Sequence, residues 1–126
     1  MKSDINVLAL AYLGDVIYEF HVRKYLINSG IVKVNELQKR AVLYVSANAQ
    51  SEFLEKLLDK NFLSEEEISI VKRARNHKGK SNPKNTSVIT YKRATGLEAL
   101  IGYLYIEGKN DRVLSIMNFI FEEEIC

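Results

Sequence analysis

Apolar residues recur three and four positions apart along most of this chain, a spacing that predicts a helical protein. The most apolar stretch runs from Tyr91 to Gly108, and between Leu97 and Ile106 only Glu98 and Gly102 are not apolar. A helix that is apolar nearly all round is packed on several sides, so we expect this stretch to form the central helix. Gly108 is expected to end it, because glycine readily takes the left-handed conformation that follows a helix.

The flanking segments carry the same period and predict further helices. These are expected within 1–30, within 34–62 as two helices, within 64–76 and within 112–124. The side chains that suit their N-terminal caps are Ser3 or Asp4, Asn35, Ser46, Ser64 with Glu67 as a capping box, and Asp111. The polar residues at 46–50 are interpreted as a helix start with a solvated face, with a segment that faces a site as the alternative. Five or six helices and no convincing strand follow, so the expected fold class is all-α.

Length and composition limit the kinds of protein that this chain can be. Its 126 residues suffice for one core, so we expect residues 1–126 to form a single domain. No apolar run approaches the roughly 18 residues of a membrane span, and no basic-then-apolar leader precedes Leu8, so a soluble, cytoplasmic protein is expected. The single cysteine is Cys126, and His21 and His77 lie far apart, so the sequence predicts neither an internal disulfide nor a zinc site.

Two acidic residues stand in apolar surroundings. Glu98 shares a helix face with Thr95 and Gly102, and these small residues leave space for a polar group to approach. Asp15 follows Gly14, which costs a helix interior roughly 1 kcal/mol relative to alanine, so close packing by another helix or a ligand is expected there. The structural alternatives are a Glu98 that reaches the surface or pairs with an arginine, and an Asp15 on a solvated stripe.

The positive charge is concentrated in one part of the chain. The net charge is only +2, yet no Asp or Glu occurs between Ile68 and Leu97. That stretch holds eight of the 18 Lys and Arg residues: Lys72, Arg73, Arg75, Lys78, Lys80, Lys84, Lys92 and Arg93. Residues 78–87 are rich in Gly, Pro, Asn and Ser and predict a loop. Basic side chains interleaved with short polar ones favour a nucleic-acid backbone as the partner, with a solvated loop as the alternative.

Asp15 and Glu98 each lie on an apolar helix with an interior glycine, so packing of these helices on one another would bring the two acids together. Paired carboxylates beside a cationic loop suit Mg2+-dependent phosphodiester chemistry, because Mg2+ prefers oxygen ligands and gathers its remaining ligands from water and phosphate. The metal would lower the pKa of a bound water and stabilise charge at phosphorus.

Five sequence motifs along the chain resemble motifs of the ribonuclease III family. Residues 10–19, LAYLGDVIYE, are similar to the signature helix of its catalytic domain, and residues 97–102, LEALIG, to its second catalytic helix. Segments 45–50, 72–76 and 83–86 are most similar to the compact Mini-ribonuclease III branch, which lacks the double-stranded-RNA-binding domain. The resemblance covers nearly the whole chain.

This resemblance implies an all-α catalytic domain that acts as a homodimer and hydrolyses both strands of double-stranded RNA with Mg2+. For the compact branch it implies maturation of the 23S (large-subunit) ribosomal RNA precursor, with a ribosomal protein that presents the substrate as a further candidate partner. Asp15 and Glu98 take the positions of metal-binding catalytic acids. The chain has Ala11 and Thr95 where full-length members carry two more acids, so we expect one essential metal, held partly by substrate phosphate.

Without a separate RNA-binding domain, the basic segment is the expected RNA contact, because an A-form duplex is recognised largely by shape through its 2′-hydroxyls and phosphates. The residues assigned to this contact are Arg73, Arg75, Asn76, Lys78, Lys80, Lys84, Asn85 and Lys92. The dimer interface is expected to use the exposed apolar part of the first helix. Two other functions stay open at this point: a non-catalytic RNA-binding or ribosome-assembly factor, and a helical protein-interaction module.

Overall fold

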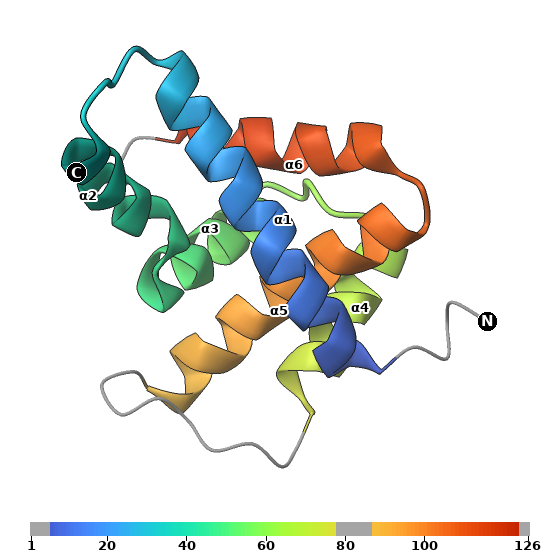
Figure 1. The fold of residues 1–126 in the computed structure, drawn as a ribbon. Coiled ribbons are helices and arrows are strands. Elements are labelled where there is room, and N and C mark those ends of the chain that lie inside the picture. Colours follow the sequence, from blue (N-terminus) through green and yellow to red (C-terminus); the bar gives the residue numbers. More distant parts are fainter. Residues whose placement is uncertain (1–5, 78–86, 124–126) are drawn as a thin grey trace.

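The computed structural model describes residues 6–77 and 87–123, which form six helices (Figure 1). In chain order they are α1 (Val7–Asn28), α2 (Val34–Val45), α3 (Ala47–Asp59), α4 (Glu65–Arg75), α5 (Val88–Ile106) and α6 (Asn110–Glu122). No strand occurs in these two ranges, which confirms the all-α prediction. No helix within them is both long and apolar enough to cross a membrane.

Several of the predicted helix ends are confirmed. Ser46 caps α3, since its Oγ accepts a hydrogen bond from the backbone N–H of Ala49 at 3.1 Å. Ser64 and Glu67 form the predicted capping box at the start of α4. Gly108 follows α5 with φ of +78°, the left-handed conformation that favours glycine.

Other predicted ends are wrong by a few residues. The N-cap of α1 is Asn6, whose Oδ1 accepts from the N–H of Leu8 at 2.7 Å, while Ser3 and Asp4 lie outside the described residues. Helix α2 starts after Lys33 without a side-chain cap, and not at Asn35. Helix α5 starts at Val88 and not at Tyr91. Helix α6 starts after Lys109, so Asp111 lies in its first turn and is not its cap. In α5 the cap at Ser87 draws the β-branched residues after it into the first helical turn.

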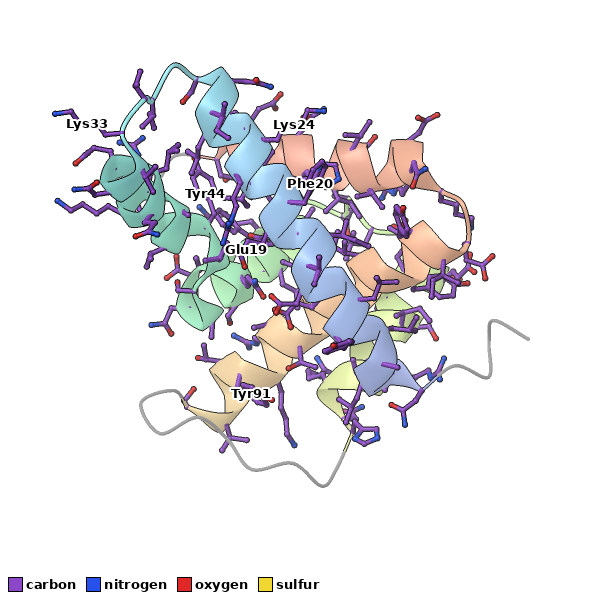
Figure 2. All side chains as sticks on the ribbon, in the orientation of Figure 1. Glu19, Phe20, Lys24, Lys33, Tyr44 and Tyr91 are labelled. Atoms are coloured by element: carbon purple, nitrogen blue, oxygen red, sulfur yellow. The ribbon has the colours of Figure 1, made fainter. Side chains whose placement is uncertain are left out.

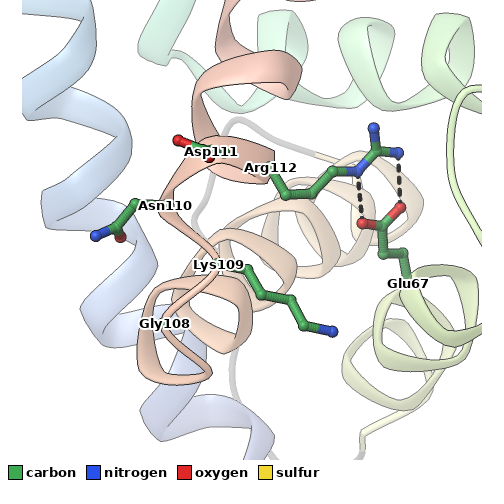
Figure 3. Close-up of a pocket in the computed structure, with 6 residues that line it drawn as sticks. All are labelled: Glu67, Gly108, Lys109, Asn110, Asp111 and Arg112. Carbon is green, nitrogen blue, oxygen red and sulfur yellow. Dashed lines mark hydrogen bonds and ion pairs between the residues drawn. The ribbon is translucent and has the colours of Figure 1, made fainter.

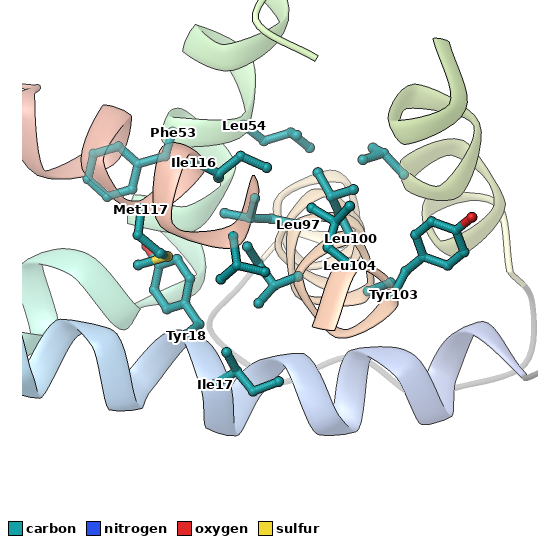
Figure 4. Packing of buried hydrophobic residues seen from close by; sticks show 14 of the residues in the cluster. Ile17, Tyr18, Phe53, Leu54, Leu97, Leu100, Tyr103, Leu104, Ile116 and Met117 are labelled. Atoms are coloured by element: carbon teal, nitrogen blue, oxygen red, sulfur yellow. The ribbon is translucent and has the colours of Figure 1, made fainter. Parts of the chain in front are cut away.

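The central helix is α5, as its apolar sequence predicts. It packs against α1, α3, α4 and α6, and Figure 1 shows it crossing α1. Every residue from Ala94 to Leu104 is buried except Glu98, which is half-buried. Its leucines meet side chains from three other helices in the core (Figure 4), namely Ile17 and Tyr18 of α1, Phe53 and Leu54 of α3, and Ile116 and Met117 of α6.

Candidate active site

The candidate site lies where α1 crosses α5 with the two backbones in direct contact. A Cβ atom built on Gly14 would lie 1.7 Å from the carbonyl oxygen of Glu98, and one built on Gly102 would lie 2.0 Å from the carbonyl oxygen of Leu10. Both distances are far shorter than van der Waals contact, so neither position accommodates a side chain without a shift of the backbone. The expected open space at Gly102 is therefore a wrong prediction, because the backbone of α1 fills it.

This close crossing sets Asp15, the residue after Gly14, beside Glu98. The two carboxyl groups lie within hydrogen-bonding reach of each other. Burial of Glu98, followed by the negative charge of Asp15 and the hydrogen bond with it, raises the pKa of Glu98 to about 8. Without a bound cation, Glu98 therefore keeps its proton at neutral pH, because two adjacent carboxylates repel each other when both are ionised.

A third polar side chain, Gln50 of α3, is buried against this pair. It is 1% exposed, its Nε2 donates to the carbonyl oxygen of Val45 at 3.3 Å, and its amide lies beside the Glu98 carboxyl group. Its contact lowers the pKa of Glu98, although the larger effects of burial and Asp15 outweigh it. The Oε1 atom of Gln50 is buried and has no hydrogen-bond partner among the described residues.

Tyr18, one helical turn after Asp15, fixes the position of α1 against α2. Its hydroxyl group is buried and donates to the carbonyl oxygen of Tyr44 at 2.7 Å. Burial, with the nearby charge of Glu98, raises the pKa of Tyr18, so its hydroxyl stays protonated and remains a donor. The last carbonyl groups of α2, which lack partners within their own helix, thus accept from Tyr18 of α1 and from Gln50 of α3.

Within residues 6–77 and 87–123, no Lys or Arg side chain forms a salt bridge with Asp15 or Glu98. Nearby basic groups pair elsewhere: Arg23 bonds Glu19, and Arg93 bonds Glu55 at 3.3 Å. The structural alternative in which Glu98 pairs with an arginine therefore finds no partner in the described part of the chain. Nor do these residues hold a cluster of three or more His, Cys, Asp or Glu side chains.

The residues assigned to RNA contact fall into two groups. Arg73 and Arg75 lie in the last turn of α4, Asn76 follows them as its C-cap, and Lys92 lies near the start of α5. Lys92 precedes Glu98 by six residues, roughly 9 Å along the helix axis. The other candidates lie outside the described residues: Lys78, Lys80, Lys84 and Asn85.

A pocket between α4 and the start of α6 has a structural explanation (Figure 3). Arg112 donates from Nε and Nη2 to the two carboxylate oxygens of Glu67 at 2.7 and 2.9 Å, and its guanidinium lies 4.7 Å from the centre of the Phe62 ring. Burial raises the pKa of Glu67, but the hydrogen bonds from Arg112 and Ser64 lower it overall. Neither Asp15 nor Glu98 lines this pocket, so we do not assign it to the candidate site.

Gln50 was interpreted from the sequence as part of a solvated face, and that prediction is wrong. The signal that identifies it is its spacing, because Gln50, Phe53, Leu54 and Leu57 occupy one helix face and are all buried. A polar residue on an apolar stripe requires a partner in the core, which here is the carbonyl oxygen of Val45, with the Glu98 carboxyl group beside it.

Comparisons with known proteins agree with this geometry. The Ribonuclease III domain family matches residues 8–109, which include both acids and Gln50. The chain is 49% identical to a Brevibacillus brevis protein named Mini-ribonuclease 3, with 92% of this chain and 85% of the relative covered. It is 46% identical to a Mini-ribonuclease 3 of Desulfitobacterium hafniense, with 97% of this chain and 78% of the relative covered.

A solved structure shares the fold as well. A crystal structure of a Fusobacterium nucleatum protein superimposes with a TM-score of 0.86 at 38% identity, and the match covers 95% of this chain and 96% of that one. The resemblance of the sequence motifs is thereby confirmed over nearly the full length. The chain therefore belongs to the ribonuclease III family of endoribonucleases, beside its relatives named Mini-ribonuclease 3.

Proposed function

We propose that residues 1–126 form one catalytic domain that cuts both strands of double-stranded RNA with Mg2+ and matures the 23S (large-subunit) ribosomal RNA precursor in the cytoplasm. Membership of the ribonuclease III family supports a divalent metal and a double-stranded RNA substrate. The identity of the metal, the ribosomal substrate and the cytoplasmic location are the more specific parts of the proposal. A ribosomal protein that presents this substrate is a compatible partner.

The observation that carries the proposal is the meeting of Asp15, which is exposed, with the half-buried Glu98, without a basic counter-charge from the described residues. Two carboxylates that share a proton have the chemistry of a divalent-cation site, because a cation between them would replace the proton and remove their repulsion. All their donor atoms are oxygens, which suits Mg2+. The residues present therefore fit the metal that the family implies.

In this proposal Asp15 and Glu98 are the side chains that would hold the cation. When bound, Mg2+ supplies Lewis-acid chemistry, polarising the phosphate and activating water. Glu98 would give up its proton to hold a cation, and the exposed Asp15 leaves the pair open to water and to RNA. Because the pair has only two acids, we expect one essential metal per site, with the remaining ligands from water and from the phosphate of the RNA.

The RNA contact is proposed for the basic side chains at the end of α4, at the start of α5 and in the intervening segment. Arg73 and Asn76 are exposed, and Arg75 and Lys92 are half-buried with long side chains that reach solvent. Cationic groups in this position would neutralise phosphates on the duplex, and the amide of Asn76 would bond a sugar or phosphate oxygen.

A homodimer is proposed across the exposed apolar surface of α1. Tyr12, Val16 and Phe20 recur every four residues and are 83%, 64% and 59% exposed. Phe20 lies on the side of α1 toward α6, where a groove with mostly apolar walls continues the surface onto Val113 and Leu114 (Figure 2). An isologous contact between two copies would cover these residues and place two acid pairs side by side, one for each RNA strand.

The dimer is tested by sedimentation velocity on wild type and on Phe20→Lys. The variant should sediment as a monomer, because a charge in the buried centre of the contact is unpaired. Val42→Lys is the matched control, since Val42 is 56% exposed but lies on α2, outside the proposed surface. If Phe20→Lys remains a dimer and Val42→Lys does not, the interface lies elsewhere.

The nuclease proposal is tested with a long RNA duplex and with a 23S ribosomal RNA precursor, each incubated with Mg2+ or with EDTA. Wild type with Mg2+ should cut both and spare single strands, while Asp15→Asn and Glu98→Gln should bind RNA without cutting it. If wild type also binds but never cuts, the protein is an RNA-binding or ribosome-assembly factor on a nuclease fold.

A further inference from the structure

Gln50 has a buried oxygen that the proposed function does not use. Its side chain is 1% exposed, and Oε1 has no hydrogen-bond partner among the described residues. A buried carbonyl oxygen without a hydrogen-bond partner destabilises the folded protein. Such an atom beside two acids suggests a ligand that the protein chain itself does not supply.

The orientation of the amide follows from its neighbours. The Nε2 group donates to the carbonyl oxygen of Val45 at 3.3 Å, and the amide also interacts with the carboxyl group of Glu98. Rotating the amide by half a turn would place Oε1 against the carbonyl oxygen of Val45, which would repel it. The nitrogen is therefore committed to Val45, and the oxygen is the end without a partner among the described residues.

The free oxygen must lie close to the acid pair. In an amide, the standard C=O and C–N bond lengths put oxygen and nitrogen roughly 2.2 Å apart. Because this amide interacts with the Glu98 carboxyl group, its oxygen lies beside the acid pair as well. That is near enough for Oε1 and the acids to face one cation or its hydration water.

We propose that Gln50 serves the cation site twice: its amide N–H holds the Glu98 carboxylate, and its Oε1 is a third oxygen donor to the divalent cation. This inference rests on the proposed function of Asp15 and Glu98 as metal ligands. It gives the site donors from three helices, α1, α3 and α5, although it has only two acids. Gln50 is a positioning residue for Glu98 as well as a ligand, and neutral amide oxygens suit hard cations.

The test measures Mn2+ binding to the whole chain by electron paramagnetic resonance at pH 8, without RNA. Gln50→Met keeps the length of the side chain but removes both polar ends, so its affinity for Mn2+ should fall at least about tenfold. Gln50→Glu keeps an oxygen at the same reach, so its affinity should be equal to that of wild type or higher. Gln38→Met, on the exposed face of α2, is the matched control and should bind as wild type does.

Each outcome decides the proposal. Melting curves in EDTA establish whether the variants fold. If Gln50→Met does not fold, the test is the Mn2+ affinity of Gln50→Glu relative to that of wild type. Unchanged affinity in Gln50→Met overturns the inference, as does a loss in both Gln50 variants, which would leave only the N–H contact with Glu98. If Asp15→Asn abolishes Mn2+ binding while Gln50→Met does not, the proposed function stands without Gln50. No Mn2+ binding and no cleavage by wild type overturns both.

Discussion

The crossing of α1 and α5 makes a sharp prediction for Gly14→Ala. Helix propensity alone predicts a gain of roughly 1 kcal/mol, because alanine is the better residue inside a helix. The structure predicts the reverse. The new Cβ would lie 1.7 Å from the carbonyl oxygen of Glu98 and 2.9 Å from the backbone nitrogen of Gly102, and both obstacles are backbone atoms that cannot rotate away.

The size of the effect follows from the distance. Restoring a contact of about 3.5 Å requires the helices to separate by roughly 1.5–2 Å at their crossing. This separation would loosen the packing of Leu10, Leu97 and Ile101, which are all 1% exposed or less. Overpacking against movable side chains costs about 1–3 kcal/mol, so against backbone we expect a net loss of about 3 kcal/mol even after the gain in propensity. For a chain of this size that lowers Tm by roughly 10 °C.

The assay is thermal and urea unfolding of the wild type, Gly14→Ala and Gly96→Ala. Gly96 is the matched control because it lies in α5 and also gains helix propensity, yet its Cβ would lie 3.2 Å from both Cγ1 and the backbone oxygen of Val71, contacts that a shift of only a few tenths of an ångström relieves. Its free energy of unfolding should change by less than about 1 kcal/mol. Cleavage of duplex RNA should fall with Gly14→Ala, because the displaced backbone carries Glu98 away from Asp15.

A Gly14→Ala variant with unchanged or higher stability would refute this reasoning, because it would mean that the helices do not meet backbone to backbone at this point. Equal losses for Gly14→Ala and Gly96→Ala would also refute it, since the two positions differ by 1.5 Å in the room available to Cβ. In either case the placement of Asp15 beside Glu98 would lose its structural basis.

Three further predictions concern charge. Folding raises the pKa of Glu98 from 4.5 to about 8, so in EDTA the wild type should lose up to about 4 kcal/mol of stability as the pH rises through this range. Glu98→Gln should remove this loss, so its free energy of unfolding should exceed that of wild type by more at pH 8.5 than at pH 5. Urea unfolding measures this difference, and a difference that is no larger at pH 8.5 contradicts the prediction. Arg112→Met leaves Glu67 buried without its partner and should lower the free energy of unfolding at pH 7 by about 3 kcal/mol, whereas an unchanged urea midpoint would mean that the pair contributes nothing. Replacing Lys78, Lys80 and Lys84 by alanine should flatten the dependence of RNA affinity on salt by about 2 in log–log slope, and an unchanged slope would remove these lysines from the RNA contact.

Much of the fold is encoded locally and was predicted from the sequence. The apolar surface of the 91–108 stretch is a property of the residues themselves, and it identified the central helix without knowledge of its neighbours. Ser46 and the Ser64–Glu67 capping box were also predicted, because caps are short-range hydrogen bonds. Two of the cap predictions failed where a helix starts without a side-chain cap, as α2 and α6 do, and in α1 the cap is Asn6 and not Ser3 or Asp4. In a helix without a side-chain cap, the packing of its apolar face sets the first helical residue, and the local sequence does not reveal that packing.

The two acids were likewise visible as anomalies in apolar surroundings. The sequence by itself determined that Asp15 and Glu98 lie on helices with interior glycines, and the ordered motifs identified the family. It could not determine that Gly14 and Gly102 meet the opposite backbones, since a glycine in a helix signals close packing without naming the partner. The tertiary structure decided that the partner of each helix is the other, and this crossing puts the carboxyl groups within reach of each other.

Gln50 shows most clearly what only the tertiary structure decided. Its position on the apolar stripe of α3 was available in the sequence, but its neighbour in the core is Glu98, 48 residues away along the chain. The contact depends on α3 packing against α5, which brings the amide to the acid pair. Local residue patterns fix which side of a helix is buried, whereas the contacts on that side depend on how the helices pack together, and the chemistry of this site depends on those contacts.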